Sequence, residues 1–447
     1  MIDKAREVAL KALYKIDKEK AYSNIVLDEE LKNNSKLLNE KDIGLISQIV
    51  YGVTTWKLTL DCIIEKHSKI KIKKISPWII NILRMGIYQI IFLDKIPKSA
   101  AVNESVNLAK RYGHKTSSGF VNAILRNVDN KDYEELFLEK DSIEKISKTQ
   151  SMPKWLIEKL LENNSIEQTE EICKNLNKKP EISIRINKLK TSKKEIIEKL
   201  EKRNIKVKET ELEDFLIIKN AKEIEKIDEF KQGLFTVQDI SAGLTALILN
   251  PKKGEKVLDA CSAPGGKTTY MAELMENEGQ IEAWDIYEHR LNLVKENCER
   301  LGIKNINTKI QNAEIYTNSE EKIYDKILLD VPCMGIGVIK RKPDIKWQRK
   351  KEDIDVINKI QFNILQNCSK YLKDGGELVY STCSILKEEN GDIIEKFVKE
   401  NPNFEIITEK EISKFSKFKQ YLEKEKYLNI LPSYKYDGFF ICKLRKK

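Results

Sequence analysis

The chain lacks the pairs and clusters of cysteine and histidine that build zinc fingers and disulfide frameworks. Its eight cysteines stand apart, none in a C-x-x-C pair, and only three histidines occur in 447 residues. Zinc modules need closely spaced ligands, and disulfide frameworks are typical of short secreted chains. The scatter therefore predicts neither, and we expect no metal. A cysteine with a chemical role has to be recognised from its local context.

Long hydrophobic runs are absent as well. A membrane-spanning helix needs about 18 consecutive apolar residues, and the longest apolar stretch, residues 87–93, is much shorter. The first residues, 1–7, are charged and lack the apolar core of a signal peptide. These absences predict a cytoplasmic protein without a membrane partner.

The chain is rich in charged residues. Charged residues make up 34% of it, the net charge is +10, and the sequence pI is about 8.9. A basic protein of this size favours an anionic partner, nucleic acid first, although a merely lysine-rich surface has the same composition. No symmetric apolar surface is evident, and we expect a monomer.

The patterns of hydrophobic residues divide the chain into three parts. Residues 1–130 show helical three-and-four spacing almost throughout. Residues 131–240 begin with a charged linker to about 150 and continue as a small α+β module. Residues 241–447 alternate strands with helices, which predicts a Rossmann-like, mostly parallel sheet. The expected strands of this last part are 256–260, 280–286, 305–311, 324–330, 377–381 and 438–444.

A glycine turn follows the first strand of the alternating part. Cys261-Ser262-Ala263-Pro264-Gly265-Gly266-Lys267 leads from that strand into a helix. Glycines allow a ligand to approach the backbone, and free amides at a helix start attract negative charge. A P-loop would need glycine where Cys261 stands, which disfavours a nucleotide triphosphate site. A purely structural turn remains the other alternative.

The next two strands end in polar residues. Asp285 lies about twenty residues after the glycines, at the position that hydrogen-bonds a ribose hydroxyl in dinucleotide folds, but the G-x-G-x-x-G fingerprint is missing. A glycine turn followed by an acidic residue, without that fingerprint, favours S-adenosylmethionine as the ligand over a dinucleotide. Asn312 ends the third strand, where its amide could meet the adenine or simply belong to a surface loop.

Two cysteines end the fourth and fifth expected strands. Asp330-Val331-Pro332-Cys333 closes one, and Ser381-Thr382-Cys383-Ser384 closes the other. Neighbouring parallel strands would bring these ends together. A single cysteine there is most often a packing residue, but two cysteines and an aspartate beside a methyl donor indicate chemistry.

Methylation of carbon 5 of a cytosine would use these groups. Carbon 5 is a poor nucleophile until a thiolate adds at carbon 6. Protonation of ring nitrogen 3, for which Asp330 is suited, assists that addition. A second group then helps to release the product.

A basic segment, residues 340–351, lies between the two cysteines. It holds seven basic residues, one acid and one tryptophan. Phosphate contacts combined with base stacking would suit single-stranded or flipped RNA, and a solvated loop is the alternative. The residues expected to contact RNA are Lys340, Arg341, Lys346 and Trp347.

The motifs at 263–267, 330–333, 337–347 and 381–384 together resemble the Sun-type RNA cytosine-5 methyltransferases over essentially the whole chain. The resemblance is strongest to bacterial members that act on 16S ribosomal RNA. The helical first part resembles the NusB family of RNA-binding antitermination factors, on segments 102–106 and 120–126.

The resemblance implies a NusB-like all-α domain (1–130), a linker with a small α+β RNA-binding module (131–240) and a class I methyltransferase domain (241–447). It implies that Cys383 is the nucleophile and that Cys333 aids product release. It also implies cofactor contacts from a larger set, namely Cys261, Ser262, Ala263, Pro264, Gly265, Gly266, Lys267, Asp285, Arg290, Asn312 and Asp330.

The sequence departs from the family pattern at Asn312, usually aspartate, at Met334, usually serine or threonine, and at Tyr324, usually phenylalanine or valine. None removes a group that the mechanism requires. Two alternatives stay open. A DNA cytosine-5 methyltransferase would use the Pro-Cys cysteine, but its Glu-Asn-Val motif is absent. A non-catalytic RNA-binding factor would keep the fold without the reaction.

Overall fold

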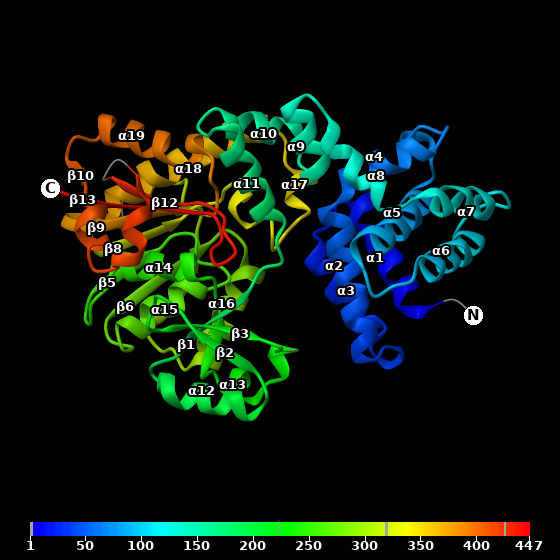
Figure 1. The fold of residues 1–447 in the computed structure, drawn as a ribbon. Helices are drawn as coiled ribbons and strands as arrows, with labels where there is room; N and C mark the ends of the chain where they lie inside the picture. The colour runs from blue at the N-terminus through cyan, green and yellow to red at the C-terminus, as the bar shows by residue number, and fades with distance from the viewer. Residues whose placement is uncertain (1–2, 222, 318–320, 424–425) are drawn as a thin grey trace. The chain divides into compact units, whose positions relative to one another are not determined.

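The computed structural model describes the chain except residues 1–2, 222, 318–320 and 424–425. Two compact units are present. Unit 1 contains residues 1–178 together with residues 339–351, and unit 2 contains residues 179–338 and 352–447. The chain therefore passes from unit 1 to unit 2, returns for one short segment, and passes back (Figure 1).

Unit 1 is helical. Its core consists of aliphatic side chains from the first seven helices, among them Val8, Ile49 and Leu83, each fully buried. Some helix starts carry side-chain caps, as at Asn39, whose side chain accepts from the amides of Lys41 and Asp42. The helices are α1 (Lys4–Glu19), α2 (Ser23–Asn33), α3 (Glu40–Thr55), α4 (Lys57–His67), α5 (Pro77–Phe92), α6 (Lys98–Tyr112), α7 (Ser117–Asn127), α8 (Asn130–Glu135), α9 (Ser142–Gln150), α10 (Lys154–Leu161) and α11 (Ile166–Asn177).

The charged segment 131–150 differs from the linker that its composition predicted. It forms α8, a short 3₁₀ turn and α9. Asp129 and Asp132 make a capping box at the start of α8, and Asp141 caps α9. On α9, Ile146 is buried between the polar residues Lys145 and Ser147. The segment is thus amphipathic, and its few apolar residues, dispersed among charged ones, did not reveal it.

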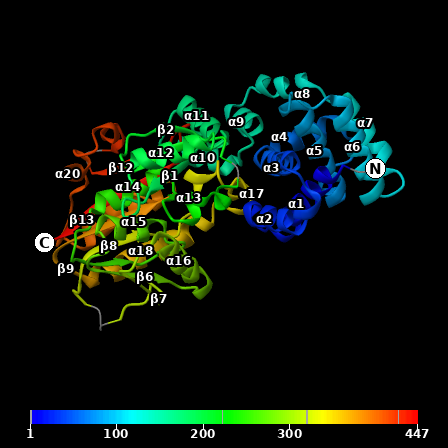
Figure 2. The same ribbon diagram turned by 90° about the horizontal axis from the view of Figure 1, so that it is seen from below.

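The returning segment 339–351 is docked on the helices of unit 1. It carries the short helix α17 (Ile345–Gln348), which lies beside α2 and α3 (Figure 2). The backbone N–H of Ser23 donates to Asp344 at 3.2 Å, so Asp344 caps α2, whose own N-cap residue, Tyr22, makes no side-chain cap. The indole N–H of Trp347 donates to the carbonyl of Thr54 at 2.7 Å.

Unit 2 begins with a small antiparallel sheet in the order β2-β3-β1-β4. Helix α12 covers one side of it, with Ile196 and Leu200 buried among the strand residues. The expectation of a small α+β module is confirmed here. Its elements are β1 (Ile182–Ile186), α12 (Lys193–Lys202), β2 (Lys206–Glu209), β3 (Phe215–Lys219), α13 (Asp228–Lys231) and β4 (Phe235–Val237).

The second sheet of unit 2 is mixed and mostly parallel at its centre. Its order is β11-β12-β13-β9-β8-β5-β6-β7, with β10 paired to β13. Strands β7, β6, β5, β8 and β9 run parallel, and β13 returns antiparallel to β9. They are β5 (Lys256–Asp259), β6 (Gln280–Asp285), β7 (Ile306–Ile310), β8 (Tyr324–Asp330), β9 (Leu372–Thr382), β10 (Phe404–Ile406), β11 (Leu422–Glu423), β12 (Tyr427–Ile430) and β13 (Phe439–Lys446).

Alternate residues of the central strands face two separate cores. Val257 and Leu328 pack on one face, while Leu258, Ile327 and Leu329 pack on the other. Both faces are therefore covered, as expected for parallel strands. The first core includes α14 (Ile240–Leu249), α15 (Gly266–Leu274) and α16 (Glu288–Leu301), and the second includes α18 (Asp353–Cys368) and α19 (Gly391–Glu400). The predicted Rossmann-like sheet is confirmed.

The first β-to-α connections determine where a ligand can bind. The chain leaves β5 toward β6 on one side and later places β8 on its other side. This is a topological switch point, where the loops at the strand carboxyl ends separate and leave room for a ligand. The loops after β5 and β8 carry the glycine turn and Cys333.

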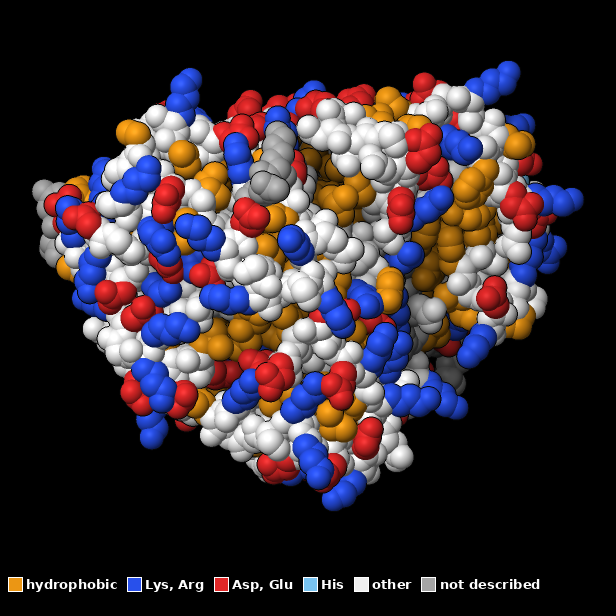
Figure 3. Space-filling view, turned by 60° about the vertical axis from the view of Figure 1, so that its left-hand side comes forward, with side chains coloured by type: hydrophobic (Ala, Val, Ile, Leu, Met, Phe, Trp, Pro, Cys, Tyr) orange, Lys and Arg blue, Asp and Glu red, His pale blue; other side chains and the backbone are white. Residues whose placement is uncertain are grey.

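Two surface properties bear on partners. No helix within the described residues is long and apolar enough to cross a membrane. On the face drawn in Figure 3, basic and acidic side chains are interspersed, so the positive charge of the chain is not gathered there into a patch of one sign.

A buried arginine joins the small sheet to helix α15. Arg185 of β1 is fully buried and donates to Glu273 of α15 at 2.7 and 3.1 Å. It also donates to the carbonyl of Gly266 at 2.7 Å and to the side chain of Gln238. The guanidinium lies 4.6 Å from the centre of the Tyr270 ring. This network fixes the small sheet against the start of α15.

We expect Arg185→Met to destabilise unit 2 by about 3–5 kcal/mol, because it leaves the Glu273 carboxylate buried without its partner. The double variant Arg185→Met/Glu273→Leu should recover most of that loss. Lys253→Met, which removes an exposed ion pair with Glu276, serves as the control and should leave the free energy of unfolding nearly unchanged. Urea unfolding measures all three. Equal losses for Arg185→Met and Lys253→Met would contradict the role of the network.

Candidate functional site

Hydrogen bonds and close packing fix the conformation of the glycine turn after β5. Ser262 donates from its amide and its hydroxyl to the carbonyl of Trp284, at 2.8 and 2.9 Å. Gly265 has φ +98°, a conformation that favours glycine, and a Cβ there would lie 3.2 Å from Val294 of α16. Gly266 then starts α15, whose first amides receive no side-chain cap. The turn thus presents backbone donors toward the strand ends.

Two buried polar atoms next to this turn have no hydrogen-bond partner among the described residues. They are Oδ1 of Asp259 and Nε2 of Gln238. Burial raises the pKa of Asp259 to about 7, although Thr268 donates to its other oxygen at 2.7 Å. An unpaired acceptor and an unpaired donor beside a helix start suit a ligand that carries an amino group and a carboxylate, as the amino-acid part of S-adenosylmethionine does. Asp259 and Gln238 were not predicted. Asp259 ends the strand before the turn, whereas nothing in the sequence marks Gln238.

The expected ribose and adenine contacts lie on the next two strand ends. Asp285 ends β6 and is 5% exposed, and Arg290 lies 3.2 Å from its carboxylate and donates to the carbonyl of Ala263. Arg290 therefore links the acid to the glycine turn. Asn312 follows β7, and its side-chain oxygen accepts from the amide of Glu314 at 3.0 Å. That hydrogen bond orders the loop. The side-chain NH₂ group of Asn312 is then the part that could donate to the adenine.

Asp330, at the end of β8, is held by two side chains. The ammonium of Lys267 lies 2.7 Å from one oxygen, and the hydroxyl of Ser381 donates to the other at 2.9 Å. Burial lowers the pKa of Lys267, but the attraction of Asp330 outweighs it and leaves that pKa raised. Lys267 thus stays charged, and it also interacts electrostatically with Cys383.

The two predicted cysteines are neighbours. The sulfur atoms of Cys333 and Cys383 are 3.1 Å apart. A hydrogen bond to Cys383, together with burial, raises the pKa of the Cys333 thiol well above its usual value. Two thiolates at this distance would repel, so the pair carries at most one negative charge near neutral pH. One sulfur can act as a nucleophile while the other keeps its proton.

A buried glutamate, which was not predicted from the sequence, positions both cysteine-bearing segments. Glu389 is fully buried and accepts from the amide of Met334 at 2.7 Å, from Gln361 at 3.1 Å and from the hydroxyl of Ser384. Asn390 adds a hydrogen bond to the carbonyl of Ser384 at 3.0 Å. These residues lie in a charged run after the fifth strand, and such runs are usually solvent-exposed. Nothing in their spacing signalled burial.

The residues expected to contact RNA do not share one environment. Lys346 is 1% exposed, and its ammonium donates to the carbonyls of Thr55 and Ser151 and to Asn177, at 3.0, 3.2 and 2.5 Å. Burial lowers its pKa to about 7. Lys346 therefore does not make the RNA contact expected of it, because protein oxygens enclose its ammonium. Lys340 is largely buried, whereas Arg341 and Trp347 are partly exposed.

Within the described residues, no group of three or more histidine, cysteine, aspartate or glutamate side chains could hold a metal ion. At the strand ends lie two thiols, a lysine–aspartate pair and backbone donors.

Sequence profiles match all three parts of the chain. The profile described as 16S rRNA methyltransferase RsmB/F matches residues 246–445. The NusB family matches residues 3–130, and a ferredoxin-like domain of the RsmF/B type matches residues 152–225. The methyltransferase profile includes the strand ends with Asp330 and both cysteines.

Relatives of similar length exist. A probable ribosomal RNA small subunit methyltransferase B from Bacillus subtilis (strain 168) is 36% identical over 99% of this chain and 98% of its own. One with the same description from Synechocystis is 34% identical, covering 99% of both chains. A crystal structure of a methyltransferase homologue from Pyrococcus horikoshii is 29% identical, with TM-score 0.55, over 66% of this chain and all of its own. The chain belongs to the RsmB/F family of 16S rRNA methyltransferases.

Proposed function

We propose that this protein transfers a methyl group from S-adenosylmethionine to carbon 5 of a cytosine in 16S ribosomal RNA. The observation that carries the proposal is the pair of cysteine sulfurs, 3.1 Å apart, beside Asp330 and the glycine turn. The relatives named for small-subunit ribosomal RNA support the substrate. The donor supplies an electrophilic methyl group, and the residues of the chain prepare the base to accept it.

The glycine turn, Gln238 and Asp259 would hold the amino-acid part of the donor, and Asp285 with Arg290 would hold its ribose. Cys383 bonds to carbon 6 of the cytosine, and the charge of Lys267 balances its thiolate. The Lys267–Asp330 pair provides a proton at ring nitrogen 3, so that carbon 5 gains electron density. Once carbon 5 is methylated, it gives its proton to water, the electrons of that C–H bond re-form the double bond between carbons 5 and 6, and Cys383 leaves carbon 6 as a thiolate. Cys333 assists this release, and ring nitrogen 3 returns its proton to the Lys267–Asp330 pair.

The roles of the two cysteines differ, which gives the sharpest test. Cys383→Ala should abolish methyl transfer, because the nucleophile is lost and the raised pKa of Cys333 keeps that neighbouring thiol protonated. Cys333→Ala should bind and attack the RNA but release it slowly, so a covalent protein–RNA adduct should accumulate. Radiolabelled methyl donor and unmethylated 16S ribosomal RNA measure the 5-methylcytidine formed, and a denaturing gel detects the adduct.

Cys298→Ala is the matched control, since Cys298 is partly buried on α16 and takes no part in the sulfur pair. It should methylate like the unchanged protein. An adduct in Cys383→Ala and none in Cys333→Ala would reverse the assignment and favour the arrangement of the DNA cytosine-5 enzymes. Label in a nucleoside other than 5-methylcytidine would overturn the cytosine chemistry.

The proton at ring nitrogen 3 can be tested at Asp330. Asp330→Asn keeps the shape of the side chain but removes its acid, and we expect kcat to fall by about 10²–10⁴. Ser381→Ala removes only one hydrogen bond to Asp330 and should lower kcat by roughly fivefold. Cofactor affinity is measured separately by calorimetry. A kcat in Asp330→Asn within threefold of the unchanged protein would remove Asp330 from the proton transfer.

A further inference from the structure

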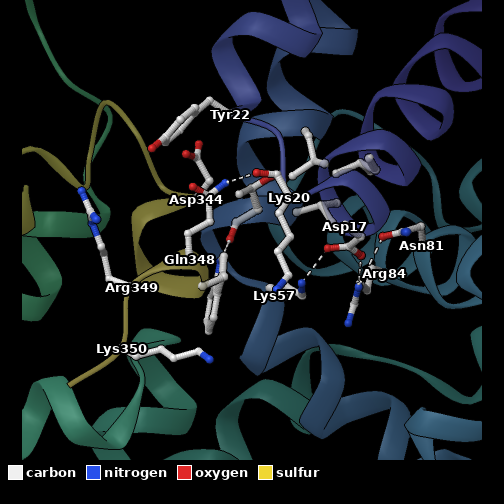
Figure 4. A pocket seen from close by; sticks show the side chains of 15 residues that line it. Asp17, Lys20, Tyr22, Lys57, Asn81, Arg84, Asp344, Gln348, Arg349 and Lys350 are labelled. Carbon is white, nitrogen blue, oxygen red and sulfur yellow. Dashed lines mark hydrogen bonds and ion pairs between the residues drawn. The ribbon is translucent and has the colours of Figure 1, made fainter. Parts of the chain in front are cut away.

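A cavity of about 450 Å³ lies inside unit 1, between the docked segment 339–351 and helices α1, α3, α4 and α5 (Figure 4). Cavities of about 300–1,000 Å³ are the size that hold small ligands or single nucleotides. Leu13, Ile16 and Val53 contribute an apolar part, and the docked segment contributes Trp347, Arg349 and Lys350. The cavity thus exists only where the returning segment meets the helical unit.

The cations deep in the cavity are already neutralised by acids. Asp17 accepts from Lys57 and from Arg84, each at 2.6 Å, and Arg84 makes two further hydrogen bonds to Asp61. Figure 4 shows Asp17 between Lys57 and Arg84. The attraction of Arg84 and Lys57 offsets the burial of Asp17, so the pKa of Asp17 is lowered although burial alone would raise it. This network gives the inner wall a fixed structure and little net charge.

Three further cations line the cavity nearer to solvent. Lys20 and Lys350 are exposed and Arg349 is partly exposed, and all three line the cavity. Counting every side chain that lines it, five cations face two carboxylates. An anionic group is therefore favoured at the side where these three residues lie.

Two aromatic rings line the same cavity. Tyr22 is 44% exposed, and Trp347 is held by its hydrogen bond to the carbonyl of Thr54. A ring that is fixed on one side and accessible on the other offers a stacking surface for a planar group. Bases stack on such rings without regard to sequence.

Asp344 adds an acceptor that the protein leaves unused. Its Oδ1 is taken by Ser23 at the start of α2, while Oδ2 is buried and has no hydrogen-bond partner among the described residues. The residue is 1% exposed and lines the cavity. A buried carboxylate oxygen without a partner is costly unless a ligand supplies a donor. The N–H groups of a base or a ribose hydroxyl would supply one.

We propose that this cavity binds one nucleotide of single-stranded ribosomal RNA outside the target cytosine. Its base stacks on Tyr22 and Trp347 and donates to Asp344, and its flanking phosphates meet Lys20, Arg349 and Lys350. An acidic peptide would satisfy the cations but offers no base to stack and brings carboxylates near Asp344. The inference rests on the proposed function only in taking RNA as the partner.

The test uses the full chain and a fluorescently labelled fragment of unmethylated 16S ribosomal RNA. Lys20→Glu/Lys350→Glu should weaken binding at least tenfold and lower the slope of log affinity against log salt by about 1.4, roughly 0.7 for each lost phosphate contact. Lys36→Glu/Lys95→Glu is the control with the same charge change, at exposed lysines of unit 1 that do not line the cavity. Equal losses in both pairs would overturn the proposal.

Variants of Tyr22 test the stacking interaction independently of charge. Tyr22→Ala should weaken RNA binding about tenfold, whereas Tyr22→Phe keeps the ring and should bind normally. RNA containing 4-thiouridine should form photo-crosslinks to peptides that contain Tyr22 or Trp347. Unchanged binding in Tyr22→Ala, or tight binding of adenosine monophosphate alone with the same dependence on Tyr22, would overturn an RNA strand as the ligand.

The same variants distinguish this inference from the proposed reaction. At saturating RNA, the kcat of Tyr22→Ala should equal that of the unchanged protein, with the effect confined to KM. If the unchanged protein binds RNA through the cavity but forms no 5-methylcytidine, the proposed function fails and the cavity assignment stands. If 5-methylcytidine forms and every cavity variant binds RNA like its control, the cavity assignment fails alone.

Discussion

The carboxylate of Glu389 accepts hydrogen bonds from both segments that carry the thiols, and the geometry of the site depends on that bridge. Its partners are the Met334 amide after Cys333 and the Ser384 hydroxyl after Cys383. A buried carboxylate is stable only when donors satisfy its oxygens. Here the donors come from two strand ends, so satisfying the charge also fixes the distance between the sulfurs. Gln361, which donates to both Glu389 and the carbonyl of Pro332, completes the bridge.

The site divides its charges between two tasks. Around the glycine turn, Oδ1 of Asp259 and Nε2 of Gln238 have no hydrogen-bond partner among the described residues, and the first amides of α15 receive no side-chain cap. A binding site for a zwitterionic group requires such available donors and acceptors. Around the thiols, Lys267, Asp330 and Ser381 are fully paired with one another. Paired groups keep their geometry when a substrate enters, which is what proton transfer at a defined atom needs. The first region is organised for binding and the second for chemistry.

Much of this arrangement could be predicted from the sequence, because it depends on strand ends. Asp285, Asp330, Cys333 and Cys383 each follow a run of buried strand residues, and parallel strands bring such ends to one edge. The alternation of helix and strand was read correctly for the same reason. The bounds of β8, Tyr324–Asp330, agree with the expected strand.

What the sequence did not reveal depends on contacts between distant segments. The antiparallel strands β10 to β12 are short and were not recognised. Glu389 lies in a charged run whose burial comes from partners up to 55 residues away. Lys346 belonged to a basic segment typical of a solvated loop, and only its three oxygen acceptors, 169 to 291 residues away, explain its burial. Composition describes a segment by itself, whereas burial is decided by its neighbours.

The return of segment 339–351 to the helical unit has a consequence for the order in which the chain acquires its structure during translation. Helices α1 to α11 are complete when residue 178 has been made, yet the carbonyls of Thr55 and Ser151 receive the ammonium of Lys346 only after 168 further residues. At about 5–20 residues per second, that interval is roughly 10–30 s. During it, water occupies the positions that the segment later fills. The helical unit therefore reaches its final form only when the strand that carries Asp330 and Cys333 has already been made.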